Sequence, residues 1–349
     1  MNKNIFREYD IRGIADIDLD SDTVYLIGKA FGKYLITNSH KSLSISGDVR
    51  KTTDRIKKSF IKGALSQGVD ICDLGILPTP VNYFSLYNTN IVNSVQITGS
   101  HNPSEYNGLK ISFNRKPFYG QDIQTLLRII EKNEFISNST PGKLFQNDIL
   151  DDYKQYMYQN IKIDKKLKVV MDCGNAVGGI IAPEIYKNLN IELEELYCDV
   201  NPDFPNHHPD PTVDSNLDDM IDVIKSGIYD VGIAFDGDAD RIVAVSDKGE
   251  IIRADILLAF FLEFIVKNGD SVVYDVKCSK SLEDIIKKLE AKPIMWKTGH
   301  SLIKNKMIDS KSKIGGEMSG HIFFSDRYFG FDDGIYVGLR LLEILSKSN

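Results

Sequence analysis

Short apolar runs alternate with segments of helical spacing along the whole chain, and this alternation constrains the fold more than any other feature. Between the runs, apolar residues recur every three or four positions, as in residues 217–224, which is the spacing of an amphipathic helix. Strands that alternate with helices predict an α/β architecture with mixed sheets. The runs typical of strands are residues 43–46, 94–98, 109–113, 168–171, 231–235, 242–245, 271–274 and 313–314.

The length of the chain predicts more than one domain. Its 349 residues exceed what one ordinary core accommodates and suit domains of roughly 100–150 residues. A polar segment at 136–141 and a tight turn at 247–250 mark two joints. Each of the three parts has strands followed by helices, so we expect three consecutive similar α/β domains with mixed sheets flanked by helices, although no sequence repeat is evident.

Composition narrows the class of function and the cell compartment. Acidic residues outnumber basic ones by 49 to 42, which argues against nucleic acid as a partner because phosphate backbones attract basic surfaces. The longest apolar run, 256–266, is interrupted by Glu263 and is too short to span a bilayer, and the first residues show no signal peptide. The cysteines, which form no Cys-x-x-Cys pair, favour a reduced, cytoplasmic setting; they are Cys72, Cys173, Cys198 and Cys278.

The segment DGDADR at 236–241 is the first candidate site. Asp236, Asp238 and Asp240 follow an apolar run and are separated only by small residues. In an extended backbone, alternate side chains point the same way, so we expect three carboxylates to converge. Such a group of like charges favours a hard cation such as Mg²⁺. The alternative is a solvated acidic turn.

The segment TGSHNP at 98–103 lies between two apolar runs and holds Ser100. We expect Gly99 to supply unusual backbone angles there, while His101 and Lys110 offer positive charge or proton transfer. Neighbouring side chains in an extended chain point apart, so His101 is a doubtful base for Ser100 in a protease-like triad. Taken alone, the segment also fits an ordinary hairpin turn.

Further polar clusters follow other strand-like runs. GGEMSGH at 315–321 combines a carboxylate, a hydroxyl and an imidazole, which suits binding to sugar hydroxyls. KTGH at 297–300 and DVK at 275–277 add donors where α/β folds collect ligands. YDIRG at 9–13 offers an arginine, a good phosphate ligand. Each cluster alone could be a polar loop.

Five of these segments, taken in order, resemble the α-D-phosphohexomutase family. They are YDIRG at 9–13, TGSHNPSEYNGLK at 98–110, DGDADR at 236–241, KTGH at 297–300 and GEMSGH at 316–321. The resemblance covers essentially the whole chain and is strongest to the phosphomannomutase/phosphoglucomutase branch. It implies domains at 1–146 (phosphoserine loop), 147–249 (metal-binding loop) and 250–349 (sugar-binding loop), with the active site in the cleft between them.

The resemblance also implies a reaction. Ser100 would carry a phosphoryl group, and Mg²⁺ would lie between that phosphate and Asp236, Asp238 and Asp240. The phosphoserine would convert a hexose 1-phosphate and a hexose 6-phosphate into each other through a hexose 1,6-bisphosphate, so glucose 1,6-bisphosphate or mannose 1,6-bisphosphate is the expected activator. No membrane partner is implied.

The resemblance assigns roles to the remaining candidates. Lys110 would be the general acid or base, with His101 and Arg12 beside the reacting atoms. Glu317 and Ser319 would hold sugar hydroxyls. The other residues implied to bind substrate or transferring phosphate are Tyr9, Arg241, Lys277, His300 and His321.

Two departures leave alternatives open. Phosphoglucosamine mutase is the alternative activity. Its typical segments are DGDGDR and GEQSGH, and this chain differs from them at Ala239 and Met318. Family members usually have a fourth domain with an RxSxTEP-like loop, and no such loop occurs in these 349 residues. We therefore expect a missing fourth domain and poor turnover. A phosphatase and a non-catalytic sugar-phosphate-binding remnant remain rivals, and the sequence decides neither the preferred hexose nor the oligomeric state.

Overall fold

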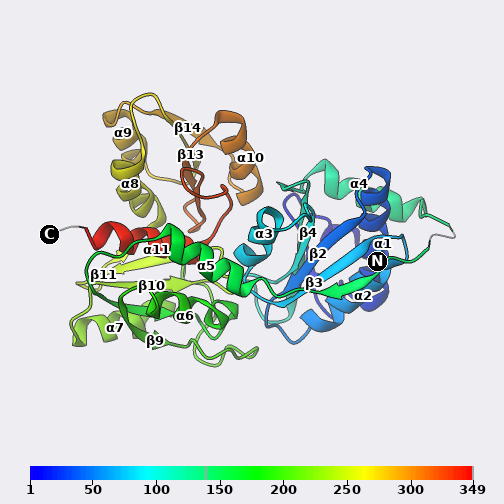
Figure 1. Cartoon of the computed structure of the whole chain (residues 1–349), viewed down its shortest axis with the longest axis horizontal. Helices are drawn as coiled ribbons and strands as arrows, with labels where there is room; N and C mark the ends of the chain where they lie inside the picture. The colour runs from blue at the N-terminus through cyan, green and yellow to red at the C-terminus, as the bar shows by residue number, and fades with distance from the viewer. Residues whose placement is uncertain (138–139, 348–349) are drawn as a thin grey trace. The chain divides into compact units, whose positions relative to one another are not determined.

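The structure is a computed structural model that describes residues 1–137 and 140–347, and the chain forms two compact units (Figure 1), Met1–Ile149 and Leu150–Asn349. All eight apolar runs overlap observed strands. The joint expected at 136–141 includes residues 138 and 139, which lie outside the described residues. The domain boundaries at 146 and 249 stay a prediction.

The first unit is built on a mixed seven-stranded sheet in the order β1-β5-β4-β2-β3-β7, with β6 paired to β5. Strands β2, β3, β4 and β7 are parallel, whereas β5 is antiparallel to its neighbours. The elements are β1 (Ile11–Ile14), α1 (Ser21–Thr37), β2 (Ser42–Gly47), α2 (Thr53–Leu65), β3 (Asp70–Ile76), α3 (Thr79–Asn88), β4 (Ser94–Ile97), β5 (Tyr106–Phe113), β6 (Lys116–Pro117), α4 (Gln121–Glu131) and β7 (Leu144–Gln146), after a 3₁₀ helix at Lys3–Ile5.

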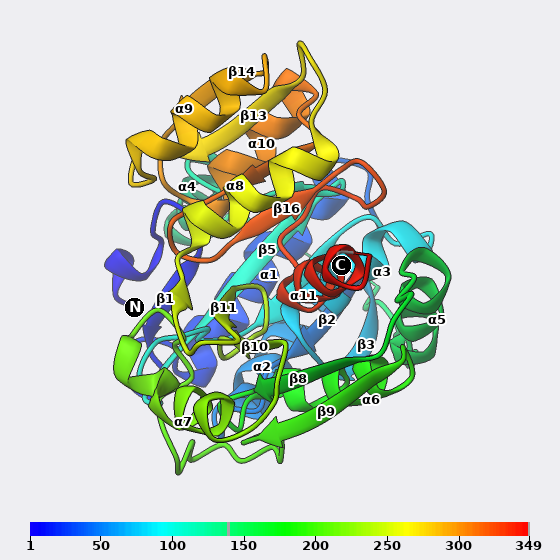
Figure 2. The same ribbon diagram turned by 90° about the vertical axis from the view of Figure 1, so that its left-hand side faces the viewer.

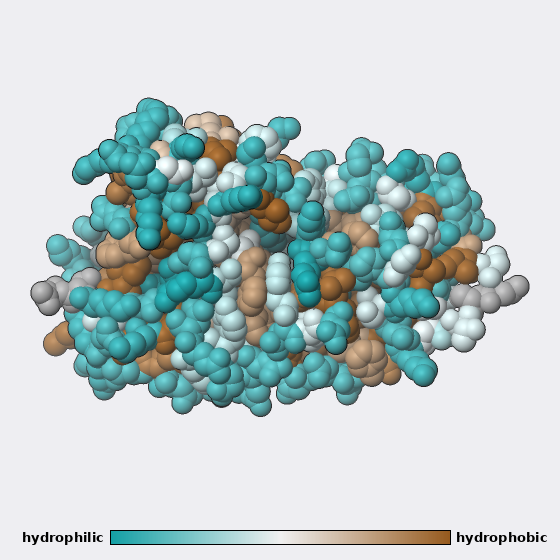
Figure 3. All heavy atoms as spheres, turned by 45° about the horizontal axis from the view of Figure 1, so that its top comes forward, coloured by the Kyte–Doolittle hydropathy of each residue, from teal (hydrophilic) through white to brown (hydrophobic). Residues whose placement is uncertain are grey.

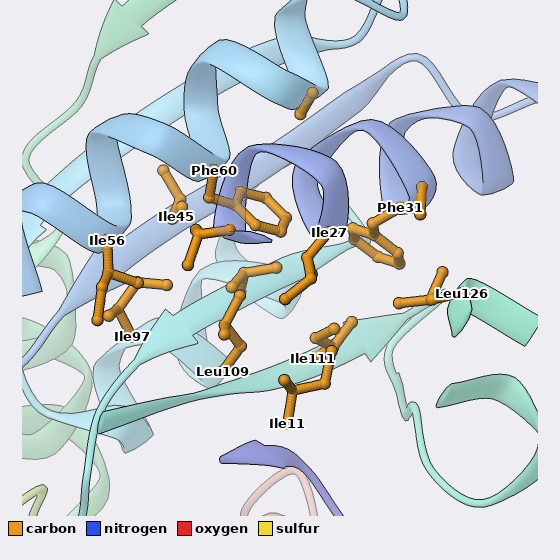
Figure 4. Close-up of a cluster of buried hydrophobic side chains, with 14 of the residues drawn as sticks. Ile11, Ile27, Phe31, Ile45, Ile56, Phe60, Ile97, Leu109, Ile111 and Leu126 are labelled. Carbon is orange, nitrogen blue, oxygen red and sulfur yellow. The ribbon is translucent and has the colours of Figure 1, made fainter. Parts of the chain in front are cut away.

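The two faces of this sheet carry different chemistry. Ile45 joins the apolar core that α1, α2 and α4 cover (Figure 4). The next residue, Ser46, points the other way and accepts a hydrogen bond from Asn82 of α3 at 2.5 Å. Ser44 likewise lies 3.1 Å from the hydroxyl of Ser85. The apolar face fixes the register of the sheet, and the polar face holds α3 by hydrogen bonds.

The second unit contains two sheets. One has the order β12-β11-β10-β8-β9 and the other β14-β13-β15-β16; Figure 2 shows β9, β8, β10 and β11 side by side. The elements are α5 (Leu150–Asn160), β8 (Leu167–Asp172), α6 (Ala182–Lys187), β9 (Ile191–Leu196), α7 (Asp218–Ser226), β10 (Val231–Phe235), β11 (Ile242–Ser246), β12 (Ile251–Ile252), α8 (Ala254–Ile265), β13 (Ser271–Asp275), α9 (Lys280–Lys288), β14 (Lys292–Trp296), α10 (His300–Ser310), β15 (Ile314–Gly316), β16 (Ile322–Phe324) and α11 (Gly334–Leu345), with 3₁₀ helices at Val177–Ile180 and Asp214–Leu217.

Helix α11 connects the two sheets of the second unit. It packs against β10 and β11 of one sheet and β16 of the other, and its apolar residues Ile335, Leu339 and Leu342 are buried. In the second sheet, a Cβ on Gly315 would face Met307 of α10, and one on Gly316 would face Leu258 of α8. Helices α8 and α10 therefore cover opposite faces of that sheet, as Figure 1 shows.

All three sheets share one topology. Each has three parallel strands followed by an antiparallel fourth, in the orders β3-β2-β4-β5, β9-β8-β10-β11 and β14-β13-β15-β16. Helices flank every sheet. The expectation of three consecutive similar α/β domains is confirmed, and the repeat lies in the topology.

The face of the molecule drawn in Figure 3 is mostly hydrophilic, and its apolar residues form small separate groups. Within residues 1–137 and 140–347, every helix is too short or too polar to cross a membrane.

Helices α1 and α2 approach each other through glycines. A Cβ on Gly63 of α2 would lie 2.2 Å from the carbonyl oxygen of Tyr25, and one on Gly28 of α1 would lie 2.2 Å from that of Phe60. Both obstacles are backbone atoms that cannot rotate away. The close approach of these two helices therefore depends on the absent side chains.

We predict that Gly63→Ala lowers the free energy of unfolding by about 1–3 kcal/mol, because overpacking outweighs the helix propensity of alanine. Gly32→Ala on α1 is the matched control: its Cβ would meet its first neighbour, Cβ of Gln67, at 3.0 Å, so a smaller loss is expected. Urea unfolding of both variants measures the difference. Equal effects would contradict the packing explanation.

Candidate active site

The predicted functional segments occupy equivalent positions in the three sheets. Residues 98–105 join β4 to β5, residues 236–241 join β10 to β11, and residues 317–321 join β15 to β16. Each loop therefore leaves the carboxyl end of a parallel strand and returns through the antiparallel fourth strand. This edge of an α/β sheet is where ligands are usually bound.

Ser100 is a buried residue of the first loop and has an unusual backbone. Its φ is +48°, a left-handed conformation uncommon for residues other than glycine. The prediction that Gly99 would supply the unusual angle is wrong, because Gly99 is absent from the positive-φ residues of the described chain. Gly99 instead leaves room for Arg50: a Cβ there would lie 2.5 Å from the Arg50 guanidinium carbon.

The left-handed turn also brings His101 back toward its neighbour. Oγ of Ser100 lies 3.2 Å from Nδ1 of His101. The expectation that the two side chains point apart assumed an extended backbone, and it fails because Ser100 is not extended. His101 is therefore placed to exchange a proton with the serine oxygen.

Arg12 and Lys110 lie on one face of the first sheet. Arg12 is opposite Gly108, and Lys110 is two residues farther along β5, opposite Gln96 of β4, so the two cationic side chains share a face. Lys110 is buried, and Arg12 is ion-paired with Asp10. Tyr9 is half-buried just before β1.

The acidic loop holds three buried carboxylates. Asp236, Asp238 and Asp240 are each 0% exposed, and one oxygen of each lies within 4.8 Å of the others. They converge through a turn, with Ala239 at a φ of +59°, rather than through the alternation of an extended strand. Oxygen-only donors with this burial fit a hard divalent cation such as Mg²⁺.

Arg241 neutralises part of this negative charge. Its Nε donates to Oδ2 of Asp236 at 2.9 Å, and its Nη2 lies 3.5 Å from Oδ1 of Asp210. Burial alone would lower the pKa of Arg241, but the carboxylates of Asp236 and Asp210 outweigh burial and raise it. One guanidinium group among these carboxylates leaves an excess of negative charge for a cation to balance.

Glu317 heads the third loop. Its side chain is buried and accepts a hydrogen bond from the backbone of Gly299, and the Ser319 hydroxyl donates to it at 3.3 Å. Burial raises the pKa of Glu317. Lys277 is exposed after β13. Glu317 and Ser319 are thus brought together as predicted, and no contact joins Lys277 to them among those recorded for the described residues.

Asp332 joins the two predicted histidines. Its Oδ2 lies 3.2 Å from Nδ1 of His300 and 3.0 Å from Nδ1 of His321, while Lys304 donates to Oδ1 at 2.7 Å. His321 also lies 3.6 Å from Oδ1 of Asp240. Although burial alone would raise it, Lys304 and the histidines hold the pKa of Asp332 well below its usual range. This cluster connects the acidic loop to the third loop.

Backbone hydrogen bonds make the same connection. Ile242, directly after the acidic loop, donates to the carbonyl of Gly320 at 3.2 Å, and Gly334 at the start of α11 donates to the carbonyl of Ala239 at 3.1 Å. A Cβ on Gly334 would lie 2.6 Å from the carbonyl oxygen of Arg241. The acidic loop and the third loop are therefore held as one structure.

Asp48, Arg50 and Asp332 organise these loops but were not predicted to do so. Asp48 and Arg50 follow β2, and Asp332 precedes α11. The available signal was weak: a carboxylate and a guanidinium two residues apart after a strand, and two acidic residues directly before a helix.

Comparison with known proteins agrees with this geometry. Residues 3–137, 151–249 and 253–349 match the phosphoglucomutase/phosphomannomutase alpha/beta/alpha domains I, II and III, respectively. The chain is 43% identical over 346 residues to a phosphomannomutase/phosphoglucomutase of Pseudomonas aeruginosa, covering 99% of this chain and 74% of that protein. It is 41% identical over 349 residues to a phosphoglucomutase of Neisseria meningitidis serogroup A, covering 99% and 76%.

A solved structure shows the same fold. The crystal structure of a phosphoglucomutase/phosphomannomutase family protein from Burkholderia thailandensis matches with a TM-score of 0.96 at 39% identity, covering 100% of this chain and 78% of that one. The fold and the loops thus define a phosphosugar enzyme of the α/β class. The chain belongs to the α-D-phosphohexomutase family, a family of isomerase-class phosphotransferases.

The buried carboxylates predict stabilisation by metal. Mg²⁺ at 100 times its Kd should raise the free energy of unfolding by about 2.7 kcal/mol, and chelation should remove the gain. Asp238→Asn should weaken this response, whereas Asp247→Asn, at an exposed position after β11, should keep it. Thermal unfolding with and without Mg²⁺ provides the measurement. A wild-type melting temperature indifferent to Mg²⁺ would contradict the site.

Asp333 predicts a pH-dependent stability. It caps α11 by accepting from the backbone of Tyr336 and from the hydroxyls of Tyr153 and Tyr328, and burial raises its pKa to about 6. The folded state then holds the proton more tightly than the unfolded state. The stabilisation is present below about pH 4 and is lost as pH rises to about 6.

The variant Asp333→Asn isolates this effect because asparagine does not titrate. The unfolding free energy of the wild type minus that of the variant should fall by up to about 3 kcal/mol between pH 4 and pH 7. Urea unfolding at several pH values measures it. A difference that stays constant would show that Asp333 has an ordinary pKa.

Proposed function

We propose that this chain is a phosphomannomutase/phosphoglucomutase that converts hexose 1-phosphate and hexose 6-phosphate into each other through phosphoserine at position 100. The observation that carries the proposal is Ser100 itself, held in a left-handed conformation in the loop after β4 with its oxygen beside His101. The names of the relatives at 41–43% identity support the same activity. Because those names include both sugars, we propose glucose and mannose phosphates as substrates.

In the proposed reaction, the free hydroxyl oxygen of the sugar phosphate attacks the phosphorus of phosphoserine 100. The bond from phosphorus to Oγ of Ser100 breaks, a bond to the sugar oxygen forms, and the sugar hydroxyl loses its proton to a base. Lys110 is our candidate for that base, and His101 would return a proton to the serine oxygen. The hexose 1,6-bisphosphate then turns around and gives its other phosphoryl group back to Ser100.

The remaining residues would bind and orient the reactants. Asp236, Asp238 and Asp240 would hold Mg²⁺, which supplies positive charge that stabilises the transferring phosphoryl group. Arg12 and Arg241 would contact phosphate oxygens. Glu317 is buried yet adjacent to Ser319, so the pair suits hydrogen bonds to sugar hydroxyls. The remaining residues proposed to bind substrate are Tyr9, Lys277, His300 and His321.

Activation and location complete the proposal. Glucose 1,6-bisphosphate or mannose 1,6-bisphosphate would phosphorylate Ser100 and start the cycle. We also propose a cytoplasmic location, supported by four buried cysteines without a disulfide among them.

A coupled assay tests the activity. Glucose 1-phosphate or mannose 1-phosphate is supplied with Mg²⁺ and a trace of glucose 1,6-bisphosphate, and formation of the 6-phosphate is followed. Ser100→Ala should lose activity by a factor on the order of 10⁴ or more and acquire no phosphoryl group. Ser104→Ala, at an exposed position in the same loop, should retain both.

Each rival predicts a different result. Release of inorganic phosphate without 6-phosphate would indicate a phosphatase. Binding of sugar phosphate without phosphoserine would indicate a non-catalytic protein. The measured rate also tests the expectation of poor turnover.

A further inference from the structure

Arg50 lies outside every segment predicted to be functional, yet its guanidinium group donates hydrogen bonds to several backbone carbonyls around Ser100. It is 4% exposed, in the segment between β2 and α2. Its Nη1 donates to the carbonyl oxygens of Pro103 at 2.6 Å and Tyr106 at 3.1 Å. Its Nη2 donates to those of Ser100 at 2.7 Å and Asn102 at 2.5 Å.

These contacts use the N–H donors at both terminal nitrogens of the arginine. A guanidinium group has five N–H bonds, and the four at Nη1 and Nη2 point to the four loop carbonyls. Nε lies 3.3 Å from Oδ2 of Asp48, which also balances the charge. Arg50 is therefore committed to the loop backbone and is unsuited to bind a substrate phosphate directly.

Asp48 holds the same loop by accepting hydrogen bonds from a backbone amide and a side-chain hydroxyl of the loop. Its Oδ2 accepts from the backbone of Gly99 at 3.1 Å and from the Thr98 hydroxyl at 2.9 Å. The Thr98 hydroxyl oxygen in turn accepts from the backbone of Ser100 at 2.8 Å. Asp48 and Arg50 thus hold both the amide and the carbonyl of the serine residue.

We propose that Arg50 is a positioning residue for phosphoryl transfer: together with Asp48 it holds Ser100 in the left-handed conformation that directs Oγ. A left-handed serine is unfavourable on its own and persists only where its surroundings impose it. The absent side chain of Gly99 lets the guanidinium approach. The catalytic part of this inference rests on the proposed function. The restraint of the loop by Arg50 and Asp48, called the clamp below, can be measured independently.

Arg50→Lys is the test variant. Lysine keeps the charge, but its three donors share one nitrogen and cannot span four carbonyls. We expect kcat to fall by about 100-fold, since small misplacements of reacting groups cost this much, with the KM for glucose 1-phosphate less affected. Amide hydrogen exchange in residues 98–106 should become faster. After long incubation with glucose 1,6-bisphosphate, the amount of phosphoserine per chain should equal that of the wild type.

Arg55→Lys is the matched control. Arg55 lies on α2 and also donates to loop carbonyls, those of Leu19 at 2.9 Å and Ala15 at 2.8 Å. These belong to the segment after β1, which meets the loop of Ser100 at its far end, where the amide of Ala15 donates to the carbonyl of Glu105 at 2.8 Å. Activity should stay within about twofold of the wild type, and exchange in residues 98–103, around Ser100, should not change.

The outcomes separate the clamp from a general loss of structure. Wild-type kcat and wild-type exchange in Arg50→Lys would overturn the proposal. A smaller amount of phosphoserine per chain that still reacts at the wild-type rate would also overturn it, because that result indicates a partly unfolded population. An equal loss of kcat in Arg55→Lys would overturn it as well. If the wild-type chain never acquires phosphoserine, the proposed function fails, and hydrogen exchange alone tests whether Arg50 holds the loop. Faster exchange in Arg50→Lys but not in Arg55→Lys supports that role, and unchanged exchange in Arg50→Lys refutes it.

Discussion

One constraint of strand direction organises this protein. Parallel strands must be joined by long crossovers, whereas an antiparallel partner can follow after a short loop. Each of the three sheets contains a single such partner next to its third parallel strand. A short loop therefore leaves the carboxyl edge of every sheet at the same position, and the loops of Ser100, of Asp236 and of Glu317 are three versions of it.

Buried charge is the second theme, and it ties the parts of the second unit together. Isolated carboxylates are costly in an interior, and only partners or cations make them tolerable. Asp236 relies on Arg241, whereas Asp240 approaches His321, which in turn shares Asp332 with His300 and Lys304. Because His321 faces both Asp240 and Asp332, a change at the cation site alters the electrostatic environment of the third loop.

Much of the fold and the main site residues could be predicted because they depend on local patterns. Apolar runs predicted the principal strands, and the spacing of acidic residues pointed to the buried group of carboxylates. The backbone at Ser100 could not be predicted, since its φ results from contacts with Asp48 and Arg50, which lie about fifty residues earlier. The same holds for His101, whose position depends on that φ, and for Asp332, whose partners come from α10 and the third loop.

The left-handed backbone at Ser100 also limits which hydroxyl-bearing residue can occupy that position. Threonine has a hydroxyl that could carry a phosphoryl group equally well, but its branched Cβ makes a φ of +48° strongly unfavourable. Aspartate and asparagine tolerate this region better. The backbone, more than the chemistry of the hydroxyl, therefore selects serine over threonine, and a lineage that adopted threonine would first have to rebuild the turn.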